Sequence, residues 1–134
     1  MNLNNLNICM LPMNIAWGEK SVNKERLEHA MKRMHPDTDI LVLPETFSTG
    51  FPTGSDIDDV KVYAETEGDS EMVSYLKDIS SRYNVAITGS IIINKESKLF
   101  NRFLFIEPSG EITYSDKRHL FRMGGEDKLF EPGR

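Results

Sequence analysis

Residues 40–43 form an unbroken apolar run, Ile-Leu-Val-Leu, with polar segments on both sides. A strand with one solvated face alternates apolar and polar residues, whereas a strand covered on both faces is apolar throughout. The run therefore predicts a central strand of a sheet that is covered on both faces. Two further apolar stretches, residues 6–11 and 85–93, predict a buried first strand and a third strand of the same sheet.

Two helical patterns separate these three strands. The first begins at a Ser21 cap and is stopped by Pro36, and the second begins at Asp69 or Ser70. Each pattern has one apolar stripe, formed by Leu27, Ala30, Met31 and Met34 in the first helix and by Met72, Leu76, Ile79 and Tyr83 in the second. The strand-helix-strand-helix-strand order predicts the α/β class, a mixed sheet with two helices.

The rest of the chain predicts strands without helices. Residues 47–59 are rich in Ser, Thr, Gly, Pro and Asp, so we expect a loop directly after the central strand. Residues 100–106 and 112–115 predict a fourth and a fifth strand, which extend the third strand into an antiparallel meander. Because no repeat or linker interrupts the 134 residues, we expect one unit.

Composition excludes several classes of function. Lys and Arg number 16 and Asp and Glu 21, for a formal net charge of −5, and no basic stripe offers itself to nucleic acid. The single cysteine, Cys9, cannot form an internal disulfide, which favours the cytoplasm. Residues 1–7 resemble neither a signal peptide nor a membrane span, so no membrane partner is expected.

A few residues could carry chemistry. Glu45 follows the central strand, where α/β folds place reactive groups, although a carboxylate there can also simply end a strand. Lys117 follows the fifth strand, where it could enter a site or protect a sheet edge from pairing. His119 is typical of a structural histidine, and Cys9 lies in an apolar strand where thiols are usually inert. No pattern indicates a metal or another cofactor.

Two motifs together are more specific than either residue alone. Residues 41–47 (Leu-Val-Leu-Pro-Glu-Thr-Phe) and residues 114–121 (Tyr-Ser-Asp-Lys-Arg-His-Leu-Phe) resemble the nitrilase, or carbon–nitrogen hydrolase, superfamily in content and order. The omega-amidase branch is the nearest resemblance within it, on residues 47–51, 101–103, 107–110 and 122–123.

The resemblance implies a four-layer α-β-β-α sandwich and a Glu, Lys and Cys triad that hydrolyses a small-molecule amide without a cofactor. Glu45 would be the general base, and Lys117 would stabilise the tetrahedral oxyanion. A second family glutamate, which helps to hold the lysine and the substrate, corresponds to Glu126.

The family's nucleophilic cysteine follows a further strand beyond the second glutamate, and these 134 residues do not contain that motif. We therefore expect an incomplete nitrilase-like domain, the N-terminal half of the sandwich, that is inactive alone. Its open sheet face should make it a homo-oligomer or bind the other half. The alternatives are a nitrilase, a carbamoyl-amide hydrolase, or a non-catalytic remnant that acts as an interaction module.

Overall fold

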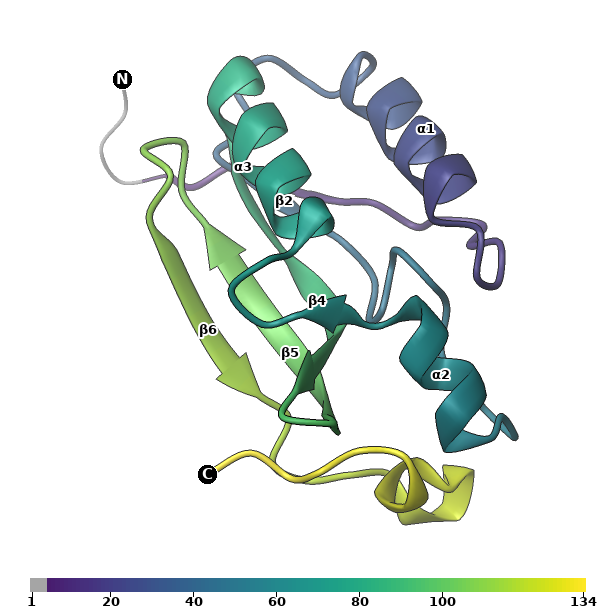
Figure 1. Ribbon diagram of the computed structural model, residues 1–134. Coiled ribbons are helices and arrows are strands. Elements are labelled where there is room, and N and C mark those ends of the chain that lie inside the picture. The colour runs from purple at the N-terminus through teal and green to yellow at the C-terminus, as the bar shows by residue number, and fades with distance from the viewer. Residues whose placement is uncertain (1–4) are drawn as a thin grey trace.

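A computed structural model describes residues 5–134 (Figure 1). Within these residues a six-stranded sheet has the order β1-β2-β4-β5-β6, with β3 paired to one end of β4. The strands are β1 (Ile8–Met10), β2 (Ile40–Val42), β3 (Glu65–Thr66), β4 (Ala86–Lys95), β5 (Lys98–Ile106) and β6 (Ile112–Asp116). The helices are α1 (Lys20–Met31), α2 (Ile57–Tyr63) and α3 (Glu71–Tyr83), followed by the 3-10 turns η1 (Arg122–Gly124) and η2 (Glu126–Lys128). The expected mixed α/β class is confirmed.

The first half of the sheet is parallel, as is usual for strands that are joined through helices. β2 lies between β1 and β4, with Leu41 beside Cys9 on one side and Ile87 on the other. β1, however, is an edge strand, and the expectation that it is buried is wrong. Met10 is 76% exposed, because β1 has a neighbour on one side only and one of its faces is uncovered. Residues 1–4 of the N-terminal stretch lie outside the described residues.

Helices α1 and α3 lie side by side on one face of the sheet (Figure 1). α3 begins at Ser70, whose hydroxyl accepts a 3.0 Å hydrogen bond from the Val73 amide, and this capping bond satisfies an otherwise unpaired donor. α1 begins two residues earlier than expected: its N-cap is Glu19, and Ser21 lies inside the helix. The buried residues of the main core are Leu27, Met31, Leu41, Leu43, Phe47, Met72, Leu76, Ile79, Val85, Ile87, Ile91, Ile93, Leu104 and Ile106.

The second half is the expected antiparallel meander. β4 and β5 pair over nine positions, from Ile87 opposite Ile106 to Lys95 opposite Lys98. Glu96 and Ser97 both have positive φ angles, as a two-residue hairpin turn with the twist of its strands requires. A second turn at Gly110, with φ of 90°, leads into β6.

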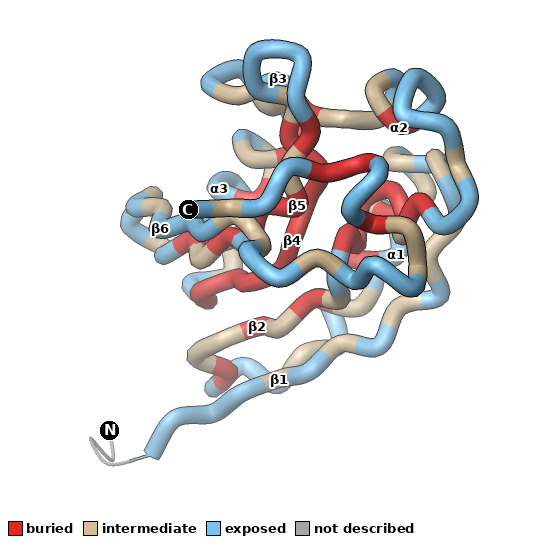
Figure 2. The backbone as a smooth tube through the Cα atoms, turned by 90° about the horizontal axis from the view of Figure 1, so that it is seen from below, coloured by how far each residue is buried: buried red, intermediate tan, exposed pale blue. Residues whose placement is uncertain are grey.

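The other face of the sheet is only partly covered. A smaller core of Val60, Ile92, Leu99, Leu129 and Phe130 shows that α2 and the C-terminal segment pack on one end of it. The helix α2 was not expected, because its first residues fall in the segment 47–59 that reads as a loop. Over the rest of this face Ile8, Met10 and Phe103 are exposed. In Figure 2 the exposed and half-buried residues of β1 lie at some distance from the buried residues of β4.

Among residues 5–134, none of the helices has the length and apolarity needed to cross a membrane.

Candidate active site

Three charged side chains from distant parts of the chain meet at this partly open face. The Lys117 Nζ atom lies 2.8 Å from Oε1 of Glu45 and 3.0 Å from Oε2 of Glu126. The structure therefore brings together Glu45 and Lys117, the charged residues of the two motifs, and Glu126 joins them. The ammonium lies between two carboxylates, so the cluster carries one positive and two negative charges.

The end of β2 and the residues after it place Glu45. Leu43 donates its amide to the Thr88 carbonyl at 2.7 Å, which continues the pairing with β4 to the Leu-Pro-Glu motif. Thr46 then turns the chain with a φ of 47° and donates its amide to the Ser90 hydroxyl at 2.8 Å. A non-glycine residue with positive φ is uncommon and must be held by its surroundings. The turn after Glu45 is thus fixed by a side chain of β4.

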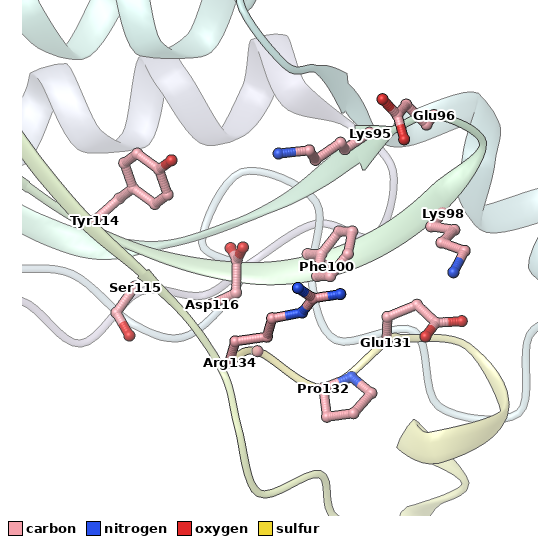
Figure 3. Close-up of a pocket in the computed structure, with 11 residues that line it drawn as sticks. Lys95, Glu96, Lys98, Phe100, Tyr114, Ser115, Asp116, Glu131, Pro132 and Arg134 are labelled. Carbon is pink, nitrogen blue, oxygen red and sulfur yellow. The ribbon is translucent and has the colours of Figure 1, made fainter.

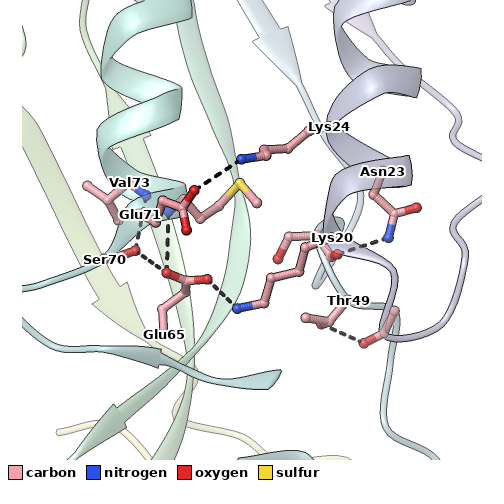
Figure 4. A network of polar contacts seen from close by, with 11 residues as sticks. Lys20, Asn23, Lys24, Thr49, Glu65, Ser70, Glu71 and Val73 are labelled. Carbon is pink, nitrogen blue, oxygen red and sulfur yellow. Dashed lines mark hydrogen bonds and ion pairs between the residues drawn. The ribbon is translucent and has the colours of Figure 1, made fainter. Parts of the chain in front are cut away.

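A buried asparagine fixes the loop that follows. Asn23 of α1 is fully buried; its side chain donates to the carbonyls of Ala16 and Ser48 at 2.8 and 2.9 Å and accepts from the Ala16 amide at 2.8 Å. Figure 4 shows Asn23 beside Lys20 and Thr49. Since every polar atom of the amide has a partner, the loop is tied to α1 by satisfied hydrogen bonds.

Glu65 links the same region to α3 (Figure 4). Its carboxylate pairs with Lys20 of α1 and accepts hydrogen bonds from the Ser70 hydroxyl at 2.9 Å and the Met72 amide at 3.3 Å. Burial raises the pKa of the Glu65 carboxyl, but these contacts lower it more, so the pKa lies below its usual value. The ionised carboxylate thereby joins the first turns of α1 and α3.

Lys117 is the first residue after β6. Its amide donates to the Asn101 carbonyl of β5 at 2.8 Å, and its carbonyl accepts from the Gly133 amide at 2.9 Å. The backbone is therefore held on both sides, and the side chain is about one-third exposed. The alternative of a lysine that only protects a sheet edge does not fit, because the ammonium contacts two carboxylates.

Glu126 lies in η2, and its side chain is fully buried. The carboxylate accepts a 2.6 Å hydrogen bond from the Phe121 amide besides its contact with Lys117. Burial raises the pKa of the Glu126 carboxyl, yet the Phe121 amide, Lys117 and Asn101 lower it more, so the net pKa lies below 4.5, its ordinary value. Glu126 is ionised at neutral pH.

The pKa of Lys117 is shifted in the opposite direction to that of Glu126. Burial lowers the pKa of its ammonium, but Glu45 and Glu126 raise it more, and the net pKa lies above the ordinary value of 10.5. The lysine therefore keeps its positive charge at neutral pH. A fixed charge in a partly desolvated site is suited to stabilise a negative charge that develops on a substrate.

Asn101 is the residue of the cluster that sequence reasoning missed. Its side-chain nitrogen donates to Oε1 of Glu45 at 2.7 Å and to Oε1 of Glu126 at 3.2 Å. The sequence showed Asn101 only as part of the 101–103 resemblance. The available signal was an amide inside a largely apolar strand, since buried amides usually have defined partners.

A hollow of about 510 Å³ opens beside the cluster. Its lining residues are Leu43, Glu45, Gly89, Ser90, Asn101, Phe103, Ser115, Asp116, Lys117 and Arg118. The lining combines the apolar side chains of Leu43 and Phe103 with a carboxylate and an ammonium. Such a combination is typical of sites that bind small molecules. The volume falls in the usual range of roughly 300–1,000 Å³ for such pockets.

A second hollow, of about 570 Å³, lies where β5 and β6 meet the C-terminal segment (Figure 3). Here Asp116 pairs with the guanidinium of Arg102 through two hydrogen bonds of 2.7 and 2.9 Å. Arg102 also pairs with Glu67 at 2.8 Å and lies over the Tyr114 ring at 4.1 Å. Because these charges are already paired with one another, we interpret the network as a structural one.

The remaining candidates do not reach the cluster. Cys9 is half-buried and packs against the core under α1 and α3, on the opposite face of the sheet. His119 is exposed and has no part in the cluster. In the part of the chain that the structure describes, no three His, Cys, Asp or Glu side chains are arranged to hold a metal ion.

Comparisons with known proteins agree with this geometry. The carbon–nitrogen hydrolase family matches residues 7–134. The omega-amidase YafV of Yersinia enterocolitica is 31% identical over 133 residues, which cover 98% of this chain and 48% of that protein. The 2-oxoglutaramate amidase of Bacillus subtilis is 30% identical over 135 residues, which cover 92% of this chain and 50% of that protein.

A solved structure gives the same result. The CN-hydrolase superfamily protein XC1258 from Xanthomonas campestris superposes with a TM-score of 0.86 at 32% identity, over 98% of this chain and 48% of that one. The chain thus spans about half the length of the curated relatives it matches. With the family match over residues 7–134 and the shared fold, the chain belongs to the carbon–nitrogen hydrolase family.

Proposed function

We propose that this chain supplies the base and the oxyanion-stabilising lysine of an amide hydrolase of the omega-amidase type. The observation that carries the proposal is the Lys117 ammonium, held at 2.8 Å from Glu45 and 3.0 Å from Glu126 beside an open hollow. The substrate class is a monoamide of a small dicarboxylic acid or a 2-oxo acid amide. The names of the relatives, omega-amidase and 2-oxoglutaramate amidase, support this class.

The roles follow from charge and position. Glu45 is nearly half exposed and borders the hollow, so it can accept a proton from a thiol as the sulfur attacks the amide carbon. The Lys117 ammonium stabilises the oxyanion of the tetrahedral intermediate. The C–N bond then breaks, Glu45 returns the proton to the leaving ammonia, and a thioester remains. Water cleaves the thioester with Glu45 as base, which releases the acid and restores the thiol.

Glu126 serves this reaction through the lysine. Its buried carboxylate lies 3.0 Å from the ammonium and holds it in place. Because the pKa of Lys117 is raised and that of Glu126 is lowered, both groups stay charged at neutral pH. The fixed pair leaves Glu45 as the carboxylate that gains and loses the proton.

The proposed reaction needs a thiol on the open face. The one cysteine of the sequence, Cys9, packs against the helix-covered face. We therefore propose that the nucleophile comes from outside these 134 residues, and that the chain alone releases no ammonia from amides.

The open face also indicates a partner. Ile8, Met10 and Phe103 are exposed on it, and Phe103 also lines the hollow. We propose that a further part of the same protein or a second copy of the chain covers this face. The single cysteine favours the cytoplasm, and the release of ammonia from amides would place the enzyme in nitrogen metabolism.

The test begins with the coding DNA beyond the Arg134 codon. The protein encoded by the continuous reading frame is purified and assayed for ammonia release from 2-oxoglutaramate, simple nitriles and carbamoyl amino acids, next to Glu45→Gln and Lys117→Met variants. We expect activity on the 2-oxo acid amide that both substitutions abolish. A stop codon directly after Arg134, or activity that survives Glu45→Gln, would overturn the proposal.

A further inference from the structure

Asn101 touches all three charged residues of the cluster. Its side-chain nitrogen donates to Glu45 at 2.7 Å and to Glu126 at 3.2 Å, and its backbone carbonyl accepts the Lys117 amide at 2.8 Å. Its side chain is almost wholly buried, on the face of β5 that carries the hollow. Residues 45, 117 and 126 come from three separate segments, and this single strand position connects them.

The chemistry of the two neighbours determines how the amide is oriented. Ionised carboxylates only accept hydrogen bonds, so the NH₂ group of Asn101, and not its oxygen, must face Glu45 and Glu126. An NH₂ group has two protons, and each carboxylate receives one of them. Asn101 therefore supplies two donors to a site in which two carboxylates would otherwise repel each other or share a proton.

The contacts on Glu45 leave one of its oxygens available. Both the Lys117 ammonium and the Asn101 amide bind Oε1 of Glu45. Among residues 5–134, no side chain or amide donates a hydrogen bond to Oε2. A carboxylate held by two donors through one oxygen has a fixed plane, and its second oxygen is free to accept a proton from a group in the hollow.

We propose that Asn101 is a positioning residue of this site, which holds the Glu45 and Glu126 carboxylates apart around Lys117 and leaves Oε2 of Glu45 as the proton acceptor. The inference rests on the proposed function for the role of Glu45 as base. Its structural content, the control of two carboxylates by one amide, is measurable in the 134-residue chain without any turnover.

The experiment is a titration of the Glu45 and Glu126 side-chain carboxyl carbons by nuclear magnetic resonance. In Asn101→Leu, which keeps the approximate size and removes both donors, the pKa of Glu126 should rise by about one pH unit, because a hydrogen bond to a charged group is lost. Asn101→Ser should also raise the pKa of Glu126, because the serine side chain is too short to reach both carboxylates.

Thr88→Val is the matched control. The Thr88 hydroxyl is buried on the same sheet face and donates to the Leu104 carbonyl at 2.8 Å, without contacting either carboxylate. A merely structural role for Asn101 predicts that Thr88→Val shifts the two titrations as much as Asn101→Leu does. Our proposal predicts that Thr88→Val leaves both titrations unchanged.

The unaltered chain provides a further measurement that does not depend on the folding of any variant. The side-chain NH₂ resonances of Asn101 should move with the same midpoints as the two carboxyl carbons. Resonances that stay fixed through both titrations, or unchanged carboxyl pKa values in a folded Asn101 variant, would overturn the proposal. Shifted titrations in a protein that hydrolyses no amide would leave Asn101 as the positioning residue and overturn only the amidase function.

Discussion

The Nζ atom of Lys117 lies 2.8 Å from Oε1 of Glu45, although 72 residues separate the two in the sequence. The same ammonium also contacts the fully buried carboxylate of Glu126, at 3.0 Å. Removing the lysine would therefore leave a negative charge buried beside a second carboxylate, which is far more costly than removing an exposed ion pair. Substitutions of buried and of exposed charges should therefore differ clearly in their cost to stability.

Lys117→Met should lower the free energy of unfolding by about 1–3 kcal/mol, because Glu126 loses a charged hydrogen-bond partner. Lys61→Met is the matched control: Lys61 has similar exposure and lies 3.7 Å from Asp58, whose side chain is in water. That substitution should cost at most about 0.5 kcal/mol. Urea unfolding followed by circular dichroism measures both, and equal losses would contradict the buried-charge interpretation.

Glu126→Gln should reduce stability at neutral pH and change its pH dependence. The folded pKa of Glu126 lies below 4.5, so its stabilising contribution is complete above that value and is lost as the pH falls through the folded pKa. The difference in unfolding free energy between the unaltered chain and Glu126→Gln should therefore shrink in acid. Glu131→Gln, at an exposed position, serves as the control. A difference that stays constant with pH would rule out the ionised state of Glu126.

Lys117 predicts the opposite dependence at high pH. Its folded pKa lies above 10.5, so its contribution is complete below that value and is lost as the pH rises through the folded pKa. The stability lost in Lys117→Met should therefore decrease in strong alkali. Urea midpoints across the alkaline range test this, with Lys61→Met as reference.

Arg102→Met should destabilise the protein by about 2–4 kcal/mol, since Asp116 and Glu67 lose a shared, buried partner. Arg102 is 7% exposed, whereas Arg82 also pairs with two carboxylates, Asp78 and Glu28, but is 48% exposed. Arg82→Met should cost much less than Arg102→Met, because the Arg82 ion pairs are screened by water. Arg102→Lys should lie between them, because an ammonium cannot form the paired hydrogen bonds of a guanidinium. Thermal and urea unfolding measure the three losses of stability, and a loss in Arg82→Met as large as that in Arg102→Met would contradict the prediction.

The open sheet face should make the 134-residue chain self-associate. Phe103→Ser should weaken the association, because burial of apolar area drives it at roughly 25 cal/mol per Å². Val62→Ser is the control, because Val62 is an apolar residue that is even more exposed than Phe103 but lies on α2. Sedimentation velocity over a range of concentrations measures the effect. A monomer at every concentration would mean that the face needs no cover.

The central part of the fold could be predicted from the sequence. Apolar runs or stripes in the sequence indicate most of its elements, namely the strands β2, β4, β5 and β6 and the helices α1 and α3. Ser70, the N-cap of α3, was one of the two expected caps. α2 could not be read, because it has seven residues within a segment rich in helix breakers. β3 has two residues and carries no pattern.

The site was predictable to the extent that its chemistry resides in motifs. Glu45, Lys117 and Glu126 were all named from the sequence, and the structure brings them together. Asn101 was missed because its importance comes from register: it lies opposite Ile92 in the β4–β5 pairing, which places it on the face of the cluster. A shift of one residue would turn it to the helix-covered face, and a sequence does not display such a register.

The β4–β5 hairpin also has a consequence for the order of folding. Its two strands are joined by a two-residue turn, so its ends meet at a small entropic cost, whereas the contact of Glu45 with Lys117 must close a loop of 72 residues. We expect the hairpin amides to gain protection from hydrogen exchange earlier in refolding than the amide of Leu43, two residues before Glu45, because the hydrogen-bond partner of that amide is the distant Thr88 carbonyl. Asn101 would then be in place before the charged side chains arrive, and the hairpin would act as a template on which the site assembles.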